Sequence, residues 1–393
     1  MTKTLAILGA TGSIGTQALE VLDAHPGAFE VDSLSAWRNL DALAALAVAH
    51  APRIVVVADG DAARTIAPML PARTEVLVGA EGLAEAAASA EVVLNAVVGF
   101  AGVPATLAAL AAGRRLALAN KESLIVASAL VERVRGTDGA ELLPVDSEHC
   151  AVHQCLAGLH GSDPMQWVRR IVLTASGGPF RGRTAASLAD VTVAEAMAHP
   201  TWQMGAKVTV DSSTLMNKGL EVLEAAALFG VGTDRIDVVV HPQSIVHSMV
   251  ELVDGSTLAQ LSRPDMRLPI AYALGYPARF DDGFGRLAFD GPLELTFEPP
   301  DADAFPCLGL AYEAARLGGT APAWLNAADE CAVAGFLDGS IPWSGIAALI
   351  AATLDRYDGA DCSDIDALLR ADAEARRVAS GIMGQMAPTS VLP

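Results

Sequence analysis

The chain has 393 residues and a formal net charge of −20, with 52% hydrophobic and 18% charged residues, which favours a packed globular protein over a disordered one. The acidic charge argues against nucleic acid or an anionic membrane as a partner, and no apolar run reaches the roughly 18 residues of a membrane-spanning helix. The N-terminal stretch lacks the pattern of a signal peptide and the five cysteines are scattered, so we expect a cytoplasmic protein with reduced thiols.

Short β-branched runs alternate with Ala-rich helical stretches in the first part of the chain. The alternation favours an α/β fold with a Rossmann-type, doubly wound parallel sheet, which we place in a domain spanning residues 1–146. The strands are predicted at residues 4–9, 29–36, 53–59, 75–79, 91–97, 114–120 and 141–146.

The first predicted strand leads into a glycine-rich loop with the spacing Gly9-x-x-Gly12-x-x-Gly15. In a strand–turn–helix context these glycines allow a tight turn and a close approach of backbone N–H groups to a pyrophosphate. Arg38 lies just past the second strand, where a basic group favours the 2′-phosphate of NADP, whereas Asp32 is nearer mid-strand. The loop predicts dinucleotide binding with a preference for NADP; the alternatives are a plain tight turn and a solvated arginine.

Two carboxylates follow the last strand of this sheet, at its C-terminal edge. Asp146 and Glu148 are two residues apart, so an extended backbone would place their side chains on one face. Carboxylates this close need a proton or a cation between them, and an oxygen-rich pair suits Mg²⁺ or Mn²⁺. The alternative is a helix cap, in which Ser147 or Asp146 begins the next helix.

The middle of the chain carries groups that suit a phosphate. Hydroxyl and backbone donors after a strand, or around a helix N-terminus, favour an anion; they are Ser176, Gly177, Gly178, Ser212, Asn217 and Lys218. Residues 196–206 form a predicted lid loop, in which His199, Trp202 and Met204 could close over a small ligand. The alternatives are ordinary turn glycines and an aromatic side chain anchored in the core.

A third carboxylate is available on a helix predicted at residues 213–230. Asn217, Lys218 and Glu221 point to roughly one face, which is polar within an otherwise apolar helix, as in a helix that lines a site. Lys218 and Glu221 alone also fit an ordinary helix ion pair. The sequence by itself does not bring Glu221 near Asp146.

The remaining elements complete a predicted division of the chain. A strand is predicted from residue 170, and it leads into the loop that contains Gly177 and Gly178. Further strands are predicted at residues 235–240, 244–253 and 256–262, and a tight turn at Asp254-Gly255 joins the last two. We predict a central α+β catalytic and dimerisation domain, an irregular linker and a small C-terminal helical domain, at residues 147–275, 276–302 and 303–393.

Two classes of dehydrogenase lack their required residues here. No tyrosine has a lysine four positions on, as short-chain dehydrogenases need. The carboxylates near Cys150 and Cys155 disfavour the thiolate that a semialdehyde dehydrogenase uses.

Taken together, the stretches between residues 7 and 251 resemble those of 1-deoxy-D-xylulose 5-phosphate reductoisomerases. The matching strings are "ILGATGSIG", "ALANKES", "PVDSEHCA", "TASGGPFR", "HPTWQMGAKVTVDSSTLMNKGLEV" and "HPQSIVHSMVE". The resemblance implies the metal-dependent rearrangement of 1-deoxy-D-xylulose 5-phosphate, with NADPH reduction to 2-C-methyl-D-erythritol 4-phosphate, a step of non-mevalonate isoprenoid biosynthesis. It also implies a homodimer, for which we expect the interface at the 244–262 hairpin.

The resemblance implies a role for each matching residue. As metal ligands for Mg²⁺ or Mn²⁺ it implies Asp146, Glu148 and Glu221. As substrate contacts it implies Lys121, Ser147, Glu148, Ser176, His199, Ser212, Asn217, Lys218 and Glu221, of which Lys121 and His199 join the metal ligands as catalytic residues. As NADPH contacts it implies Thr11, Gly12, Ser13, Ile14, Trp37, Arg38, Asn39, Asn120, Glu122 and Gly205.

Only four of the 26 basic residues are lysines, and the three interior ones, Lys121, Lys207 and Lys218, all fall in these stretches. Compact ammonium groups suit point contacts with phosphate or hydroxyl oxygens. Trp37 and Cys150 depart from the usual family residues, which bears on adenine packing and on the surroundings of the metal pair. The competing functions are a metal-dependent NADP sugar-phosphate dehydrogenase without isomerisation and a non-catalytic NADP-binding regulator.

Overall fold

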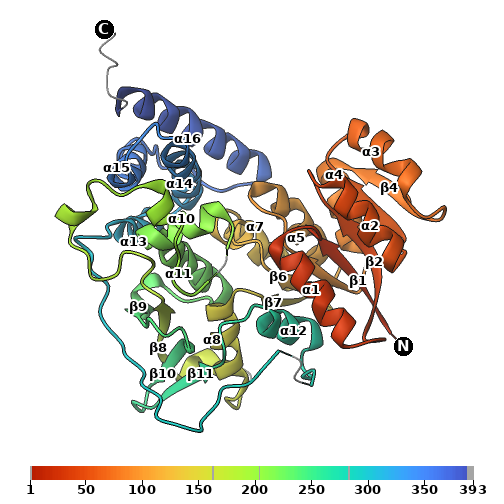
Figure 1. The fold of residues 1–393 in the computed structure, drawn as a ribbon, viewed down its shortest axis with the longest axis horizontal. Coiled ribbons are helices and arrows are strands. Elements are labelled where there is room, and N and C mark those ends of the chain that lie inside the picture. Colours follow the sequence, from red (N-terminus) through yellow and green to blue (C-terminus); the bar gives the residue numbers. More distant parts are fainter. Residues whose placement is uncertain (1, 162, 203, 282–283, 387–393) are drawn as a thin grey trace. The chain divides into compact units, whose positions relative to one another are not determined.

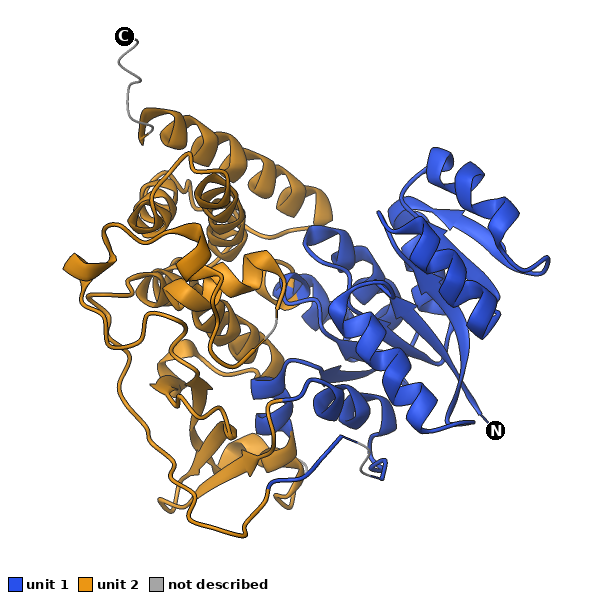
Figure 2. Cartoon of the chain, viewed as in Figure 1, with its two compact units in different colours: residues 1–123, 128–153, 265–287 blue, residues 124–127, 154–264, 288–393 orange. Residues whose placement is uncertain are grey.

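The computed structural model describes residues 2–161, 163–202, 204–281 and 284–386, and the chain divides into two units (Figure 1, Figure 2). Unit 1 comprises Met1–Ser123, Ser128–His153 and Asp265–Leu287. Unit 2 comprises Leu124–Ala127, Gln154–Pro264 and Ala288–Pro393. The chain therefore leaves unit 1 and returns to it before it ends.

Within the described residues, unit 1 is built on a seven-stranded sheet with all neighbouring strands parallel, in the order β4-β3-β2-β1-β5-β6-β7. The strands are β1 (Lys3–Leu8), β2 (Phe29–Ser35), β3 (Ile54–Val57), β4 (Glu75–Val78), β5 (Val92–Asn95), β6 (Arg115–Leu118) and β7 (Glu141–Pro144). The helices are α1 (Ser13–Ala24), α2 (Leu40–His50), α3 (Gly60–Ile66), α4 (Gly79–Ser89), α5 (Val103–Ala111), α6 (Glu122–Ile125), α7 (Ser128–Val134), α8 (Ser147–Ala157) and α12 (Arg267–Gly275), with short 3₁₀ turns η1 (Ala67–Met69) and η2 (Phe100–Gly102); α6 and α8 cross unit boundaries.

The central strands form because short apolar runs can be buried on both faces of a parallel sheet. Every residue of β3, IVVV, and of β5, VVLN, is buried, as expected when helices cover both faces. The chain order along the sheet reverses at β1, which lies between β2 and β5. Open sheets of this kind bind ligands beyond the carboxyl ends of the strands at such a point, and the predicted Rossmann-type sheet is confirmed.

Helix α12 belongs to unit 1 although it follows most of unit 2 in sequence. Its buried residues Ile270, Ala273 and Leu274 join the same apolar core as the strands β1 and β2, and α12 packs against α1. The predicted division instead gave residues 265–275 to the central domain and residues 276–287 to a linker. That division by function stays a prediction.

Within the described residues, unit 2 contains a four-stranded sheet in the order β11-β10-β8-β9 and a group of helices (Figure 1). Strand β8 runs parallel to β9, whereas β10 runs antiparallel to both β8 and β11, so the hairpin at Asp254-Gly255 is confirmed. The strands are β8 (Val168–Ala175), β9 (Ile236–Val240), β10 (Val246–Leu252) and β11 (Thr257–Leu261). The helices are α9 (Val193–Ala196), α10 (Ala206–Thr214), α11 (Met216–Phe229), α13 (Cys307–Leu317), α14 (Ala321–Leu337), α15 (Trp343–Leu354) and α16 (Ile365–Met386), with 3₁₀ turns η3 (Pro164–Trp167), η4 (Ala185–Leu188) and η5 (Thr233–Arg235).

The helix predicted at residues 213–230 is confirmed as α11, with Gly230 at its C-terminal end, but its predicted start is wrong, because residues 213 and 214 belong to the preceding helix α10. Leu215 adopts a left-handed conformation with φ of 60°, ending α10 and preceding α11. Helix α10 was missed because its sequence, AKVTVDSST, is rich in β-branched and hydroxyl residues, which are poor helix formers. Its helical state depends on packing within unit 2.

No helix among the described residues combines the length and apolar character that crossing a membrane requires.

Candidate active site

The glycine-rich loop joins β1 to α1 at the carboxyl edge of the sheet. A Cβ on Gly9, whose φ is +87°, would lie 2.5 Å from the carbonyl oxygen of Ala96, and one on Gly15 would lie 2.4 Å from the carbonyl oxygen of Gly9. Gly12 precedes α1, and no side chain caps this helix end. The first N–H groups of a helix lack partners within the helix, so this end suits the pyrophosphate of a dinucleotide.

The predicted adenine side of the loop lies just past β2. Trp37 is half-buried, whereas Arg38 and Asn39 are exposed. Asn39 also caps α2, because its Oδ1 accepts from the backbone N–H of Ala42 at 3.1 Å. Asp32, the acidic residue of this strand, instead accepts from Arg53 at 2.9 Å.

Asn120 and Glu122, two predicted cofactor contacts, bind the loop after β5. The Nδ2 group of Asn120 lies within hydrogen-bond distance of the carbonyl oxygens of Val97 (2.8 Å) and Gly99 (2.9 Å) and of Glu122. Glu122 also accepts from the backbone N–H of Gly99 at 3.0 Å. Both side chains therefore fix the protein backbone beside the cofactor edge, a positioning role that the sequence did not indicate.

The extended backbone predicted for Asp146 and Glu148 is wrong. Strand β7 ends at Pro144 and α8 begins at Ser147, and the carbonyl of Asp146 accepts the first helical hydrogen bond, from Cys150 at 2.8 Å. Glu148 therefore lies in the first turn of a helix, as in the capping alternative. The sequence did not show this because a polar i, i+2 pair fits either backbone.

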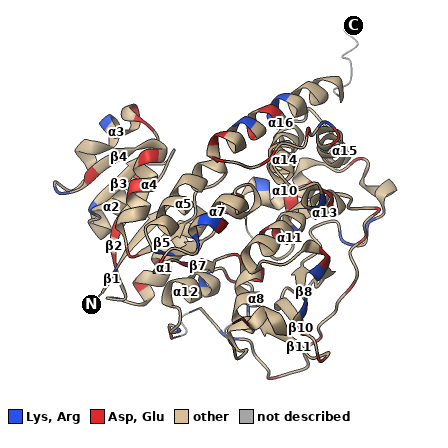
Figure 3. Cartoon of the chain, turned by 180° about the vertical axis from the view of Figure 1, so that it is seen from behind, with Lys and Arg blue, Asp and Glu red and all other residues tan. Residues whose placement is uncertain are grey.

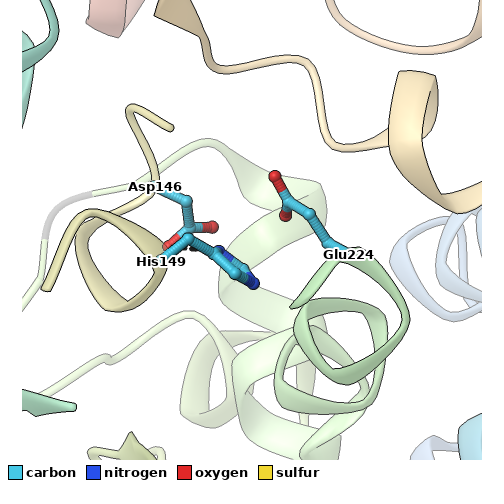
Figure 4. A group of neighbouring side chains, drawn as sticks. All are labelled: Asp146, His149 and Glu224. Carbon is cyan, nitrogen blue, oxygen red and sulfur yellow. Dashed lines mark ion pairs between the residues drawn. The ribbon is translucent and has the colours of Figure 1, made fainter. Parts of the chain in front are cut away.

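The side chains of this segment form a polar cluster within unit 1. Lys121 forms an ion pair with Asp146, and the hydroxyl of Ser147 donates to Glu148. The fully buried His149 has its Nδ1 3.8 Å from Oδ1 of Asp146. Figure 4 shows Asp146 and His149 at the entry to α8.

Helix α11 carries the third predicted carboxylate. Glu221 is 1% exposed and Lys218 3% exposed, so both charges are buried. One carboxylate oxygen of Glu221 accepts from the Nδ2 group of Asn217 and the other from the ammonium of Lys218. The three residues predicted to share a helix face are brought together as expected.

Ser176, His199 and Ser212, three predicted substrate contacts, meet in unit 2. The Nε2 atom of His199 lies 3.1 Å from the hydroxyl oxygens of both serines. Gly178, with φ of +64°, lets the loop after β8 approach α10, since a Cβ there would lie 2.5 Å from the carbonyl oxygen of Ser212. A side chain at this position would push the two serines apart.

The tautomer of His199 follows from its other nitrogen. Nδ1 accepts from the backbone N–H groups of Thr201 (3.1 Å) and Trp202 (2.9 Å), so in the neutral ring Nε2 carries the proton and donates toward a serine oxygen. Burial lowers the pKa of His199 below the ordinary histidine value, which favours this neutral form. His199 thus links the lid loop to β8 and α10.

The predicted lid loop, residues 196–206, leads directly into α10, with Gly205 as the residue before the helix. Its Trp202 ring makes an edge contact with His247 of β10, with the ring centroids 6.2 Å apart. The sequence indicated no role for His247. Its contact with the lid loop becomes visible only in the structure, where β10 pairs with β8. Gln203, which belongs to the predicted lid, lies outside the described residues.

Three protein-family models match the chain in sequence order. The model described as 1-deoxy-D-xylulose 5-phosphate reductoisomerase matches residues 5–128. Two models of C-terminal domains of the same reductoisomerase match residues 142–229 and 261–378.

Named relatives are similar over nearly the whole chain. A 1-deoxy-D-xylulose 5-phosphate reductoisomerase of Xanthomonas axonopodis pv. citri (strain 306) is 51% identical over 381 residues, covering 96% of each chain. The enzyme of that name from Symbiobacterium thermophilum is 52% identical over 386 residues, covering 96% of this chain and 98% of the relative.

Solved structures agree with this similarity. The reductoisomerase of Zymomonas mobilis in complex with NADPH superimposes with a TM-score of 0.91 at 42% identity, covering 98% of this chain and 99% of the other. A DOX-P reductoisomerase in complex with NADPH, fosmidomycin and magnesium gives a TM-score of 0.91 at 40% identity, covering 97% and 98%.

Proposed function

Because the chain belongs to the 1-deoxy-D-xylulose 5-phosphate reductoisomerase family, we propose that the site described above performs the reaction of that family. The enzyme converts 1-deoxy-D-xylulose 5-phosphate into 2-C-methyl-D-erythritol 4-phosphate with NADPH and a divalent cation, Mg²⁺ or Mn²⁺. The observation that carries the assignment of residues is the junction of Ser176, His199 and Ser212, which provides donors for a phosphate within unit 2.

Asp146 in unit 1 and Glu221 in unit 2 each lie in surroundings that suit a ligand of a divalent cation. Asp146 and Glu221 each pair with an ammonium group, Lys121 and Lys218 respectively, so each already requires positive charge beside it. Carboxylate oxygens are the ligands that Mg²⁺ and Mn²⁺ prefer. We assign Asp146, Glu148 and Glu221 as the ligands, and the bound cation would stabilise negative charge on the substrate oxygens during the rearrangement.

When these carboxylates hold the cation, the ammonium groups become available to the substrate. Lys121 and Lys218 then offer point charges to the substrate, Asn217 offers an amide donor, and Ser147 offers a hydroxyl between two of the ligands. These side chains orient the reacting carbons with respect to the hydride donor. Orientation of this kind supplies a large share of catalysis.

The phosphate is assigned to the two serines, Asn217, Lys218 and His199. In its neutral form His199 donates from Nε2, so it binds a phosphate oxygen as a hydrogen-bond donor without carrying charge. Its Nδ1 holds the lid backbone at Trp202, and an ordered lid excludes water from a reactive aldehyde. Phosphate binding and lid order therefore share one residue.

NADPH is assigned to the carboxyl edge of the sheet in unit 1. The uncapped N-terminus of α1, with Thr11, Gly12, Ser13 and Ile14, takes the pyrophosphate. Exposed Arg38 takes the 2′-phosphate, and Trp37 and Asn39 flank it. Gly205 is assigned to the cofactor from the lid side.

We further propose that the enzyme works in the cytoplasm as a homodimer that pairs through the β10–β11 hairpin. Strand β11 is the edge of its sheet and alternates exposed and half-buried residues. An edge strand offers backbone N–H and C=O groups to a second copy. Light scattering on a size-exclusion column measures the mass, and a monomer at micromolar concentration would refute the dimer.

The reaction is tested by following NADPH oxidation with 1-deoxy-D-xylulose 5-phosphate, with and without EDTA. Turnover in saturating Mg²⁺ or Mn²⁺ that EDTA abolishes is expected, and its absence would overturn the assignment. Isotope tracing must find the branched skeleton in the product; an unbranched product would favour the sugar-phosphate dehydrogenase.

The ligand assignment is tested with Glu221→Gln. This change removes one negative charge and should lower kcat by about 10²-fold or more, in line with the loss of a metal ligand or its support, while NADPH binds as before. Glu374→Gln on α16, whose carboxylate pairs with Arg377 as that of Glu221 pairs with Lys218, is the matched control. Equal activity of the two variants would remove Glu221 from the metal site.

A further inference from the structure

A cluster of three charged groups, two fully buried carboxyl groups and one partly exposed ammonium, joins α10 to α14 next to the assigned Ser212. The ammonium of Lys207 is 2.6 Å from Asp211, one turn on in the same helix, and 2.7 Å from Asp329 of α14. The carboxyl groups are 1% and 0% exposed. Lys207 therefore ties α10 to α14 through the interior of unit 2.

The charges of this cluster do not balance unless it holds a proton. One ammonium and two ionised carboxylates would leave a net negative charge on two buried carboxyl groups, which is costly. In the part of the chain that the structure describes, Oδ1 of Asp211 and Oδ1 of Asp329 have no hydrogen-bond partner. A single proton held between the carboxyl groups would make the cluster neutral and would supply the missing bond.

The surroundings favour that proton. Burial and the neighbouring Asp329 raise the pKa of Asp211 well above its usual range, against the pull of Lys207. Burial opposes the charged form of Lys207, but the two carboxyl groups still raise its pKa, so it stays an ammonium. From α13 the cluster faces Cys307, whose thiol pKa burial raises, so this group stays neutral.

Helix α10 links the cluster to the phosphate junction. Ser212, which lies 3.1 Å from Nε2 of His199, directly follows Asp211. Ser213 accepts a hydrogen bond from the indole Nε1 of Trp343 in α15 at 2.9 Å. The sequence of α10 is a poor helix former, so these contacts decide where its backbone lies.

We propose that Lys207, Asp211 and Asp329 form a positioning cluster that holds α10 against α14 and so places the Ser212 hydroxyl for the phosphate of the substrate. The proposal rests on the proposed function for its substrate and goes beyond it by assigning three residues that touch neither substrate nor cofactor. Loss of the shared proton as the pH rises leaves two buried carboxylates on one ammonium and releases α10 from α14.

The sign of the pH effect follows from the raised pKa of Asp211. The protonated form is favoured in the folded protein, so the contribution is complete below the ordinary aspartate pKa and is lost as the pH rises through the raised value. The KM for the sugar phosphate should therefore rise on the alkaline side of that raised pKa, by up to about tenfold per pH unit.

The test compares Asp329→Asn with Glu330→Gln in saturating Mg²⁺. Asparagine has the shape of the protonated acid and donates a hydrogen bond at every pH, so Asp329→Asn should keep a near-normal KM at neutral pH and abolish its alkaline rise. Glu330, the next residue of α14, pairs instead with Arg376 of α16, a helix that contains both basic and acidic residues (Figure 3). Glu330→Gln should retain the alkaline rise of the unmodified enzyme.

Lys207→Met leaves the two carboxyl groups without their cation. It should raise the KM for the sugar phosphate about tenfold or more and change kcat by less than about threefold, because the metal ligands and the NADPH loop are untouched. An unchanged KM in folded Lys207→Met, or an alkaline rise that persists in Asp329→Asn, would overturn the proposal.

A measurement that needs no turnover separates this proposal from the reaction itself. The indole N–H resonance of Trp343, assigned by its loss in Trp343→Phe, reports the contact with Ser213. It should shift at alkaline pH in the unmodified protein and in Glu330→Gln, but not in Asp329→Asn. If the indole resonance shifts as expected but the enzyme shows no turnover, only the proposed reaction is refuted. If the enzyme turns over but the indole resonance does not change with pH, the proposed positioning cluster is refuted.

Discussion

His199 is predicted to perform two separable tasks, each through one ring nitrogen. Nδ1 accepts from the backbone of Thr201 and Trp202, and Nε2 donates toward Ser176 and Ser212. Asparagine places its Oδ1 near the position of Nδ1, and glutamine places its Nε2 near that of the distal nitrogen. His199→Asn should therefore keep the lid contacts and lose the phosphate donor, whereas His199→Gln should do the reverse.

The magnitudes follow from the bonds that each variant loses. His199→Gln loses two backbone hydrogen bonds, worth about 0.5–1.5 kcal/mol each, so lid order weakens by about 1–3 kcal/mol. If this loss falls on the closed state, kcat drops by roughly 5-fold to 150-fold. His199→Asn loses one hydrogen bond to a charged phosphate, about 1.5–3 kcal/mol, so the KM for the sugar phosphate rises by roughly 10-fold to 100-fold.

Steady-state kinetics at fixed NADPH and Mg²⁺ measure both variants. The control is His160→Ala, because His160 is exposed and lies far along the chain from the lid. Identical effects of the two variants on KM and kcat would refute the division of tasks. Activity within twofold of the unmodified enzyme in both would remove His199 from the site.

Three further predictions concern acid pH and the cofactor loop. Because burial lowers the pKa of His199, the neutral ring contributes fully to lid stability above the ordinary histidine pKa, and this contribution is lost as the pH falls toward the lowered value. Hydrogen exchange of the lid amides should therefore become faster in mild acid. Equal exchange at neutral and mildly acid pH would contradict the prediction. Gly15→Ala would place a methyl group 2.4 Å from a backbone oxygen, so calorimetry should find a free energy of unfolding lower by about 1–3 kcal/mol and weaker NADPH binding. Gly136→Ala is the control, because Gly136 has open space around it. Equal melting temperatures of the two variants would refute the steric argument. Arg38→Ala should weaken NADPH binding about threefold to tenfold and leave NADH binding unchanged. Arg73, which is also exposed, provides the control, because Arg73→Ala should change the binding of neither cofactor. Equal effects of Arg38→Ala on NADPH and NADH would show that Arg38 does not bind the 2′-phosphate.

The sequence predicted the sheet of unit 1 well, for a physical reason. Strands such as β3 and β5 are apolar on both faces and end at Gly or polar residues, a pattern that few other structures share. The sharing of a face by Asn217, Lys218 and Glu221 was also predictable, because it depends only on the period of a helix.

Other features depend on contacts that a sequence pattern does not contain. Helix α10 forms although its residues are poor helix formers. It is stabilised by the ion pair between Lys207 and Asp329, which lies far along the chain. The backbone after β7 was misjudged because the same polar residues serve as an extended pair or as a helix start. The lid contacts of His199 run from a side chain to the backbone, and any residue at positions 201 and 202 except proline offers that N–H group.

The return of the chain to unit 1 at α12 has a consequence for synthesis on the ribosome. The core of the nucleotide-binding sheet includes Ile270, Ala273 and Leu274, which emerge only after more than a hundred later residues have followed His153. At roughly 5–20 residues per second this interval is on the order of ten seconds. During that time the nascent sheet exposes the apolar surface that α12 will cover. The N-terminal half is therefore expected to need protection from aggregation until translation passes Leu287, and a fragment that ends at His153 should bind chaperones and not NADPH.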